Sequence, residues 1–215
     1  MFYYMSKKEI FEKAYNQPRA IWTRPEPPEE IIELVENGNI KPCKAIDIGC
    51  GEGYYSIYLA SKGFQVTGID ISEKAIQYAK ENAAKKGVNV KFIARDIADL
   101  GNLKEKFDFV LEWGIMHIIM PPKRKEYVEK ISNILNDGGK YLSTCFNEQS
   151  PESGGAGKKQ RIGARSGNKL YYSSQDELKE LFKPYFRIIE TKIIQMRGGK
   201  GQSHISNYFF MEKTL

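Results

Sequence analysis

Three glycines and two acids form the part of the sequence whose residue types and spacing best suit chemistry. An apolar run ends in Asp47 and is followed by Gly49, Gly51 and Gly53, and a second apolar run ends in Asp70. This order predicts a strand, a tight glycine turn, a helix and a parallel strand, which open a nucleotide-binding α/β unit. The glycines let the backbone pass close to a ligand, and Asp70 is placed to accept hydrogen bonds from two ribose hydroxyls. The pattern therefore predicts a nucleoside site.

The glycine spacing selects the kind of nucleoside. A dinucleotide fold requires G-x-G-x-x-G, which would put the third glycine at the position of Tyr54. The G-x-G-x-G pattern instead resembles motif I of the class I S-adenosylmethionine (SAM) methyltransferases. SAM carries no pyrophosphate, so no third glycine is needed to clear a diphosphate at the helix N-terminus. A glycine turn that only joins strand to helix is the alternative, which the correctly placed Asp70 weakens.

The resemblance to this family implies a set of cofactor contacts. The acid before the glycine turn helps to hold the SAM ammonium group, and the methionine tail crosses the turn. The acid at the end of the second strand and its neighbour hold the ribose and flank the adenine. Asp96, after the third strand, meets the adenine amino group, and its neighbour Ile97 supplies a backbone donor. With one residue of the fourth strand and one of the N-terminal segment, the predicted cofactor-binding residues are Trp22, Asp47, Gly49, Cys50, Gly51, Gly53, Asp70, Ile71, Asp96, Ile97 and Glu112.

Some of these residues also have purely structural interpretations. Cys50 could be a nucleophile, but between two glycines it is expected to contribute only backbone and bulk. Asp70 and Asp96 could each cap a helix or turn. Trp22 could fold over the cofactor as a lid, or fix the N-terminal helices as a core aromatic residue. Three acids at strand ends around one topological switch point favour the binding interpretation.

His117, which follows the fourth strand, is the candidate catalytic residue. Methyl transfer from a sulfonium is an in-line displacement, so the protein mainly aligns and desolvates the reactants, and the sequence predicts neither a metal site nor a catalytic triad. With an ordinary pKa of about 6.5, His117 could remove or steer a proton from a thiol or hydroxyl. Alternatively, it caps or packs behind the cofactor. His204 is a weaker candidate, and Arg161 and Arg165 could clamp an acidic substrate or serve only solubility.

The methyl acceptor is predicted to be a small molecule. Glu112-Trp113-Gly114-Ile115 stands where methyltransferases of nucleic-acid amino groups have D/N-P-P-Y/F, which argues against adenine-N6 and cytosine-N4 acceptors. The segment 22–25, and Phe146 before a glycine-rich stretch and Tyr172-Ser173, resemble the branch that includes thiopurine, thiol and tellurite-resistance methyltransferases. We expect a small acceptor, with soft sulfur favoured. An enzyme acting on RNA or protein, and a SAM-binding protein without activity, are the alternatives.

Alternating strand and helix patterns position these residues in one domain, 1–215. The resemblance implies a Rossmann-like, seven-stranded, mostly parallel sheet of order 3-2-1-4-5-7-6, with its last strand antiparallel and helices on both faces. A helical lid segment is expected at 1–40 and a glycine-rich loop facing the substrate at 147–169. The expected strands are 44–48, 65–69, 89–94, 107–111, 140–146, 187–196 and 204–211. The expected helices are 7–17, 29–35, 54–61, 73–86, 125–135 and 175–182, and Pro121-Pro122 is expected to start the helix whose apolar spacing covers 125–135.

Composition favours an ordinary globular protein. The 215 residues are 41% hydrophobic and 28% charged, without an apolar run long enough to span a bilayer. The formal charge of +6 is spread over helices, except for a basic cluster at 158–165, so a nucleic-acid partner is not favoured. Cys43, Cys50 and Cys145 lack metal-ligand spacing. The chain is expected to be a cytoplasmic monomer or homodimer without a secretory signal.

Overall fold

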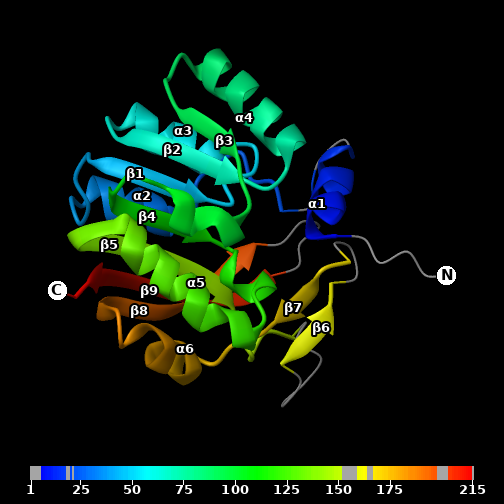
Figure 1. The fold of residues 1–215 in the computed structure, drawn as a ribbon, viewed down its shortest axis with the longest axis vertical. Helices are drawn as coiled ribbons and strands as arrows, with labels where there is room; N and C mark the ends of the chain where they lie inside the picture. The colour runs from blue at the N-terminus through cyan, green and yellow to red at the C-terminus, as the bar shows by residue number, and fades with distance from the viewer. Residues whose placement is uncertain are drawn as a thin grey trace.

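A seven-stranded sheet in the order β3-β2-β1-β4-β5-β9-β8 forms the centre of the computed structural model (Figure 1). The structure describes residues 6–17, 20, 22–151, 159–163, 167–197 and 203–214. Neighbouring strands are parallel from β3 through β5, whereas β9 is antiparallel to both β5 and β8. The predicted fold class is therefore confirmed. The strands are β1 Lys44–Ile48, β2 Gln65–Asp70, β3 Lys91–Ala94, β4 Phe107–Trp113, β5 Leu135–Phe146, β8 Phe186–Arg197 and β9 Ser203–Lys213.

Helices cover both faces of this sheet. Three of them begin at serine caps that the sequence predicts: the side chains of Ser6, Ser72 and Ser174 each accept a hydrogen bond from a backbone N–H of the first turn. The α-helices are α1 Lys7–Tyr15, α2 Glu29–Glu36, α3 Tyr54–Ser61, α4 Glu73–Lys86, α5 Pro121–Ile134 and α6 Gln175–Phe182, and the 3-10 helices are η1 Ile97–Asn102 and η2 Met116–Ile118.

Side-chain alternation along the strands divides the core between the two faces. In β4, Phe109 and Leu111 belong to the buried cluster that includes α2 and α3, whereas Val110 belongs to the cluster that includes α5 and α6. Phe92 of β3 packs with α3 and α4. Because the strands from β3 to β5 are parallel, their carboxyl ends share one edge of the sheet, and α1 lies beside that edge in Figure 1.

One predicted boundary is wrong at the fourth crossover, and another is confirmed. Helix α5 begins at Pro121, as Pro121-Pro122 predicts, because proline is suited to the first helical position, where its missing N–H is not needed. Strand β5 begins at Leu135 rather than at residue 140. Leu135 pairs with Phe107 and Lys140 with Phe109, so the glycine-containing segment between them is a bulge within the strand and not a turn before it.

The sequence predicts a loop at 147–169, but the structure also has two short strands in this region. Strand β6 (Gln160–Ile162) pairs in antiparallel fashion with β7 (Lys169–Tyr171), and both lie beside the edge where the parallel strands end (Figure 1). Residues 152–158 and 164–166 of the segment lie outside the described residues. Each strand has only three residues, too few for an alternating pattern to stand out in a glycine-rich sequence.

Within the described part of the chain, no helix combines the length and the apolar character needed to cross a membrane. In the same residues, no group of three or more His, Cys, Asp or Glu side chains is arranged to hold a metal ion.

A substitution at Gly68 of β2 can test how tightly the glycine turn packs against β3. A Cβ added there would lie 2.7 Å from the Phe92 ring and 3.1 Å from Cys50 Sγ. We expect Gly68→Ala to lower the free energy of unfolding by about 1–3 kcal/mol, because a filled core resists an added methyl group. Gly101→Ala is the control, since no heavy atom lies within 4 Å of its added Cβ. Urea unfolding compares the two variants, and equal stabilities would contradict this packing.

Candidate cofactor and acceptor site

One cavity of about 1440 Å³ lies at the carboxyl ends of the parallel strands. Sites for a single drug-sized ligand usually measure about 300–1,000 Å³, so this cavity has room for two ligands. It brings together most of the residues that the sequence predicts for a site. Those that line it are Trp22, Asp47, Gly49, Cys50, Gly51, Asp70, Ile71, Asp96, Ile97, His117, Arg161 and His204.

Asp70 joins the two loops on one side of the cavity. Its Oδ2 accepts a hydrogen bond from the Gly51 N–H at 3.0 Å, and its Oδ1 accepts one from the Ser72 N–H at 2.9 Å. Gly51 has a φ of +53°, which favours glycine, and an added Cβ there would meet the Tyr15 hydroxyl at 2.7 Å. An ionised carboxylate has about four acceptor positions. Asp70 therefore fixes the turn and keeps acceptor capacity for a ligand.

Asp47 is the second buried acid beside the glycine turn. Its Oδ2 accepts a hydrogen bond from the Ser56 hydroxyl of α3 at 2.6 Å. Burial raises its pKa to about 7, with a smaller contribution from the charge of Asp70. Burial likewise raises the pKa of Asp70 to about 6, although the N–H groups of Ser72 and Gly51 oppose this shift. A cationic ligand in this part of the cavity would therefore stabilise the ionised form of both acids.

Asp96 caps a helix and also lies in the cavity wall. Its Oδ1 accepts a hydrogen bond from the Ala98 N–H at 2.9 Å and caps η1, yet the residue also lines the cavity. Ile71 and Ile97 line the cavity beside the two strand ends. Cys50 lines it too, and burial raises the pKa of its thiol well above the ordinary value, so the thiolate needed by a nucleophile is disfavoured.

Trp22 packs against the N-terminal helix and lies at the cavity. Its indole N–H donates to the Tyr15 hydroxyl at 2.7 Å, and its ring meets those of Phe11 and Tyr15 edge-on. These three aromatic residues line the cavity together. Helix α1 is held against α4 because Glu12 accepts a hydrogen bond from the Glu73 N–H at 2.6 Å. Trp22 is therefore part of a packed aromatic group and of the cavity wall.

Two predicted cofactor residues, Gly53 and Glu112, do not line the cavity. Gly53 precedes α3 and packs against Phe92. Glu112 is fully buried. Its Oε1 accepts hydrogen bonds from the Ile115 and Met116 N–H groups at 3.0 and 2.8 Å. Its Oε2 accepts them from the hydroxyls of Tyr141 at 2.6 Å and Ser143 at 2.9 Å. Glu112 thus holds the turn before η2, where direct cofactor binding was expected.

Four stacked rings form another part of the wall, which we call the ring wall: His117, Phe146, Tyr172 and His204. The Phe146 ring lies 3.9 Å from that of His117, 4.9 Å from that of His204 and 5.4 Å from that of Tyr172, measured between centroids, with interplanar angles of 11°, 21° and 21°. The sequence did not identify Phe146 and Tyr172 as site residues. The available indications were that Phe146 ends a parallel strand and that both residues belong to the segment that resembles the small-molecule branch.

The environment of His117 differs from the sequence expectation. Burial, the charge of Arg124 and that of His204 lower its pKa to about 3, not the ordinary 6.5. The imidazole is therefore neutral near pH 7 and a weak base. Its Nδ1 is buried without a hydrogen-bond partner in the described part of the chain. His117 is consequently better suited to orienting a bound molecule than to removing a proton.

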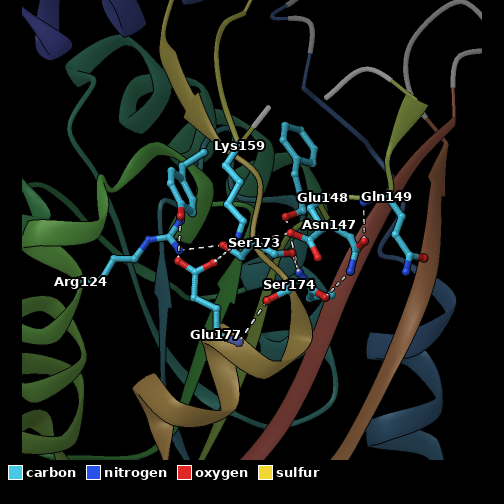
Figure 2. A network of polar contacts seen from close by, with 11 residues as sticks. Arg124, Asn147, Glu148, Gln149, Lys159, Ser173, Ser174 and Glu177 are labelled. Atoms are coloured by element: carbon cyan, nitrogen blue, oxygen red, sulfur yellow. Dashed lines mark hydrogen bonds and ion pairs between the residues drawn. The ribbon is translucent and has the colours of Figure 1, made fainter. Parts of the chain in front are cut away.

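A buried arginine holds the turn that carries His117. The Arg124 guanidinium donates to the carbonyl oxygens of Ile119 at 2.8 Å and Met116 at 3.1 Å, and to the Ser173 hydroxyl at 2.7 Å. Figure 2 shows Arg124 reaching from its helix toward Ser173. The guanidinium also lies 4.5 Å from the Tyr171 ring centroid. Helix α5, η2 and the segment after β7 are thus joined through one side chain.

Asparagine and lysine side chains continue this network to the residue before β6 (Figure 2). Asn207 donates to the Ser173 carbonyl oxygen at 2.9 Å and accepts from Asn147 at 2.7 Å. Lys159 pairs with Glu177 at 3.1 Å and with Glu148 at 3.4 Å. The end of β5, the start of β9 and the start of α6 are thereby joined. Arg161 lies exposed at the cavity, and Arg165 lies outside the described residues.

Comparisons with known proteins agree with this architecture. A family model described as a methyltransferase domain matches residues 40–188. A solved structure from work on the conversion of a disulfide bond into a thioacetal group during echinomycin biosynthesis aligns with a TM-score of 0.80 at 22% identity, covering 96% of this chain and 93% of that chain. At this level of identity, the likeness shows a shared fold.

Two curated relatives are methyltransferases. The chain is 29% identical over 149 residues to the 2-heptyl-1-hydroxyquinolin-4(1H)-one methyltransferase of Mycobacteroides abscessus, covering 66% of this chain and 65% of the relative. It is 28% identical over 140 residues to the probable S-adenosyl-L-methionine-dependent methyltransferase TehB of Haemophilus influenzae, covering 65% of this chain and 46% of TehB. The chain thus spans less than two thirds of the length of either relative.

The pKa of His117 can be measured directly because the chain has only 2 histidines. We expect the ring resonances of His117 to stay at their neutral positions between pH 5 and 8, since burial disfavours the charged form. Nuclear magnetic resonance of the ring carbons provides the measurement, and His204→Asn assigns the remaining signal. A titration midpoint near pH 6.5 would contradict the buried, neutral imidazole.

Proposed function

The chain belongs to the methyltransferase-domain family, and on that premise we propose that it transfers a methyl group from SAM to a small molecule. The observation that carries this proposal is the single cavity in which a ring wall meets a glycine turn with buried acids. The name of the TehB relative supports SAM as the cofactor, and that of the Mycobacteroides relative supports a small aromatic acceptor.

The residues of the glycine-turn side fit SAM. Asp47 and Asp70 are buried acids with raised pKa values, and no basic side chain contributes to either shift. A ligand with an ammonium group and a sulfonium would supply the missing positive charge. Asp47 would face the ammonium group, and Asp70 would accept hydrogen bonds from the ribose. Ile71 and Ile97 would flank the adenine, with Asp96 at its amino group.

The mechanism consists mainly of alignment and desolvation. When bound, SAM supplies a methyl group on a positively charged sulfur, ready for in-line displacement. The glycine turn and Asp70 would hold the cofactor, and α1 and Trp22, which line the same cavity, would exclude water from it. The ring wall would hold the acceptor beside the methyl group, since transfer is favoured when the reacting atoms lie about 3–3.5 Å apart. Arg124 and Glu112 keep the His117 turn in place during this step.

A soft sulfur is our first candidate for the acceptor atom. The turn after β4 lacks the D/N-P-P-Y/F sequence that grips a planar amine. The solved structure with a TM-score of 0.80 comes from work on the conversion of a disulfide bond into a thioacetal group. Methylation of RNA or protein is disfavoured because the described part of the acceptor region is a wall of stacked rings and not a basic surface.

Asp70→Ala tests the cofactor half of this proposal. The ribose hydroxyls would lose a charge-assisted acceptor, so we expect SAM to bind about ten- to a hundredfold more weakly. Asp108→Ala is the matched control, because Asp108 also bridges two segments, accepting from the Lys44 N–H and from Asn136, but does not line the cavity. Calorimetry measures both variants. Unchanged affinity in Asp70→Ala, with the fold intact by circular dichroism, would count against the assigned ribose contact.

The raised pKa values of Asp47 and Asp70 predict that SAM binding depends on pH. Because both carboxyls are protonated below their pKa values of about 7 and about 6, they must lose protons before they can pair with a cation. Affinity should therefore rise from pH 5.5 to pH 7.5, with proton release on binding. Calorimetry in buffers of different ionisation enthalpy measures that release. Asp47→Asn should remove the upper part of the pH dependence, and a flat wild-type profile would refute the prediction.

A further inference from the structure

The ring wall differs chemically from the rest of the cavity. The carboxylates that line the cavity come from residues 26–30, the glycine turn and the ends of β1, β2 and β3. Among the described residues, none comes from η2, β5, β7 or β9, which bear or adjoin the ring wall. The acids nearest in the chain are occupied: Glu112 accepts four hydrogen bonds, and Glu148 and Glu177 pair with Lys159.

The shape of the ring wall selects flat molecules. The rings of His117, Phe146, Tyr172 and His204 are nearly parallel, within 21° for each stacked pair. Tyr55 and Trp113 add two more rings to the lining of the same cavity. Aromatic surfaces attract other rings through offset stacking and burial of apolar area, and they offer less to a puckered molecule of equal volume. A planar ring is therefore the acceptor shape that this wall accommodates best.

The chemistry of His117 further limits the acceptor. The imidazole is neutral and a weak base, so it is unsuited to removing the proton of an alcohol or an alkyl thiol. A neutral imidazole still has one N–H donor and one acceptor nitrogen. Nδ1 is buried and has no partner in the described part of the chain, so a molecule in the cavity can reach only the other ring nitrogen, Nε2. That nitrogen can orient a bound molecule without taking its proton.

From this arrangement, and resting on the proposed function, we infer that the acceptor is a flat aromatic or heteroaromatic ring with an acidic O–H, N–H or S–H that ionises in water before transfer. The ring packs against the part of Phe146 that the other three rings leave exposed, and His117 orients it by a hydrogen bond. The ionised atom then donates an electron pair to the methyl carbon. The carbon–sulfur bond of the sulfonium breaks, its electron pair stays on sulfur, and the proton has already passed to water.

Binding of 4-nitrophenol to the complex with S-adenosylhomocysteine tests this inference without turnover. We expect saturable binding by calorimetry, weakened about fivefold in Phe146→Leu because the stacking surface is lost. Tyr78→Leu is the control, since Tyr78 is a half-buried ring on α4 that does not line the cavity. S-adenosylhomocysteine should bind both variants as it binds the wild type. Failure of the wild-type complex to bind 4-nitrophenol would overturn the inference.

Methylation of two matched pairs keeps the test independent of any variant that fails to fold. Benzenethiol should exceed cyclohexanethiol in kcat/KM by about tenfold or more, because only the former is flat and acidic. The kcat/KM for 4-nitrophenol should likewise exceed that for phenol, which has the same ring but is a weaker acid. Equal kcat/KM within both pairs would overturn the inference and leave the proposed function standing. Transfer of labelled methyl to none of a broad set of small molecules would instead overturn the proposed function.

Discussion

The carboxylate of Asp70 is the contact on which the geometry of the cofactor side depends. It accepts hydrogen bonds from the Gly51 and Ser72 N–H groups and so joins the glycine turn to the start of α4. The carbonyl of Ile69, one residue earlier, accepts from the Gly49 and Cys50 N–H groups at 2.8 and 2.9 Å. The end of β2 therefore determines where the turn lies. A buried acid used in this way costs desolvation free energy, and a cationic ligand can recover part of that cost.

A second buried acid has the same structural role at the end of β4. Glu112 accepts two N–H groups of the following turn and two hydroxyls from β5, and so fixes the position of η2. Arg124 holds the other side of that turn through the carbonyls of Met116 and Ile119. The two sides of the cavity are thus built alike, with a strand-end acid bonded to the next turn. They differ in what lines the cavity, which is carboxylates beside β2 and rings beyond β4.

Local features of the sequence were sufficient to predict the fold and most of the residues that line the cavity beside the glycine turn. The spacing of Gly49, Gly51 and Gly53, the acids at strand ends and the serine caps act over a few residues, so a single sequence displays them. The ring wall arises from contacts between distant segments, since His204 reaches Phe146 only because β9 pairs with β5. The same limit explains the role of Glu112 and the lowered pKa of His117. Both result from burial and from partners that the tertiary fold brings together.

The central claim is that the cavity recognises SAM and not a dinucleotide, because Tyr54 stands where a pyrophosphate would need a glycine. Titration calorimetry of the wild-type chain with SAM and, separately, with NAD tests this claim most directly. The account predicts saturable binding of SAM at a single site and at least about a hundredfold weaker binding of NAD. Tighter binding of NAD than of SAM would contradict it.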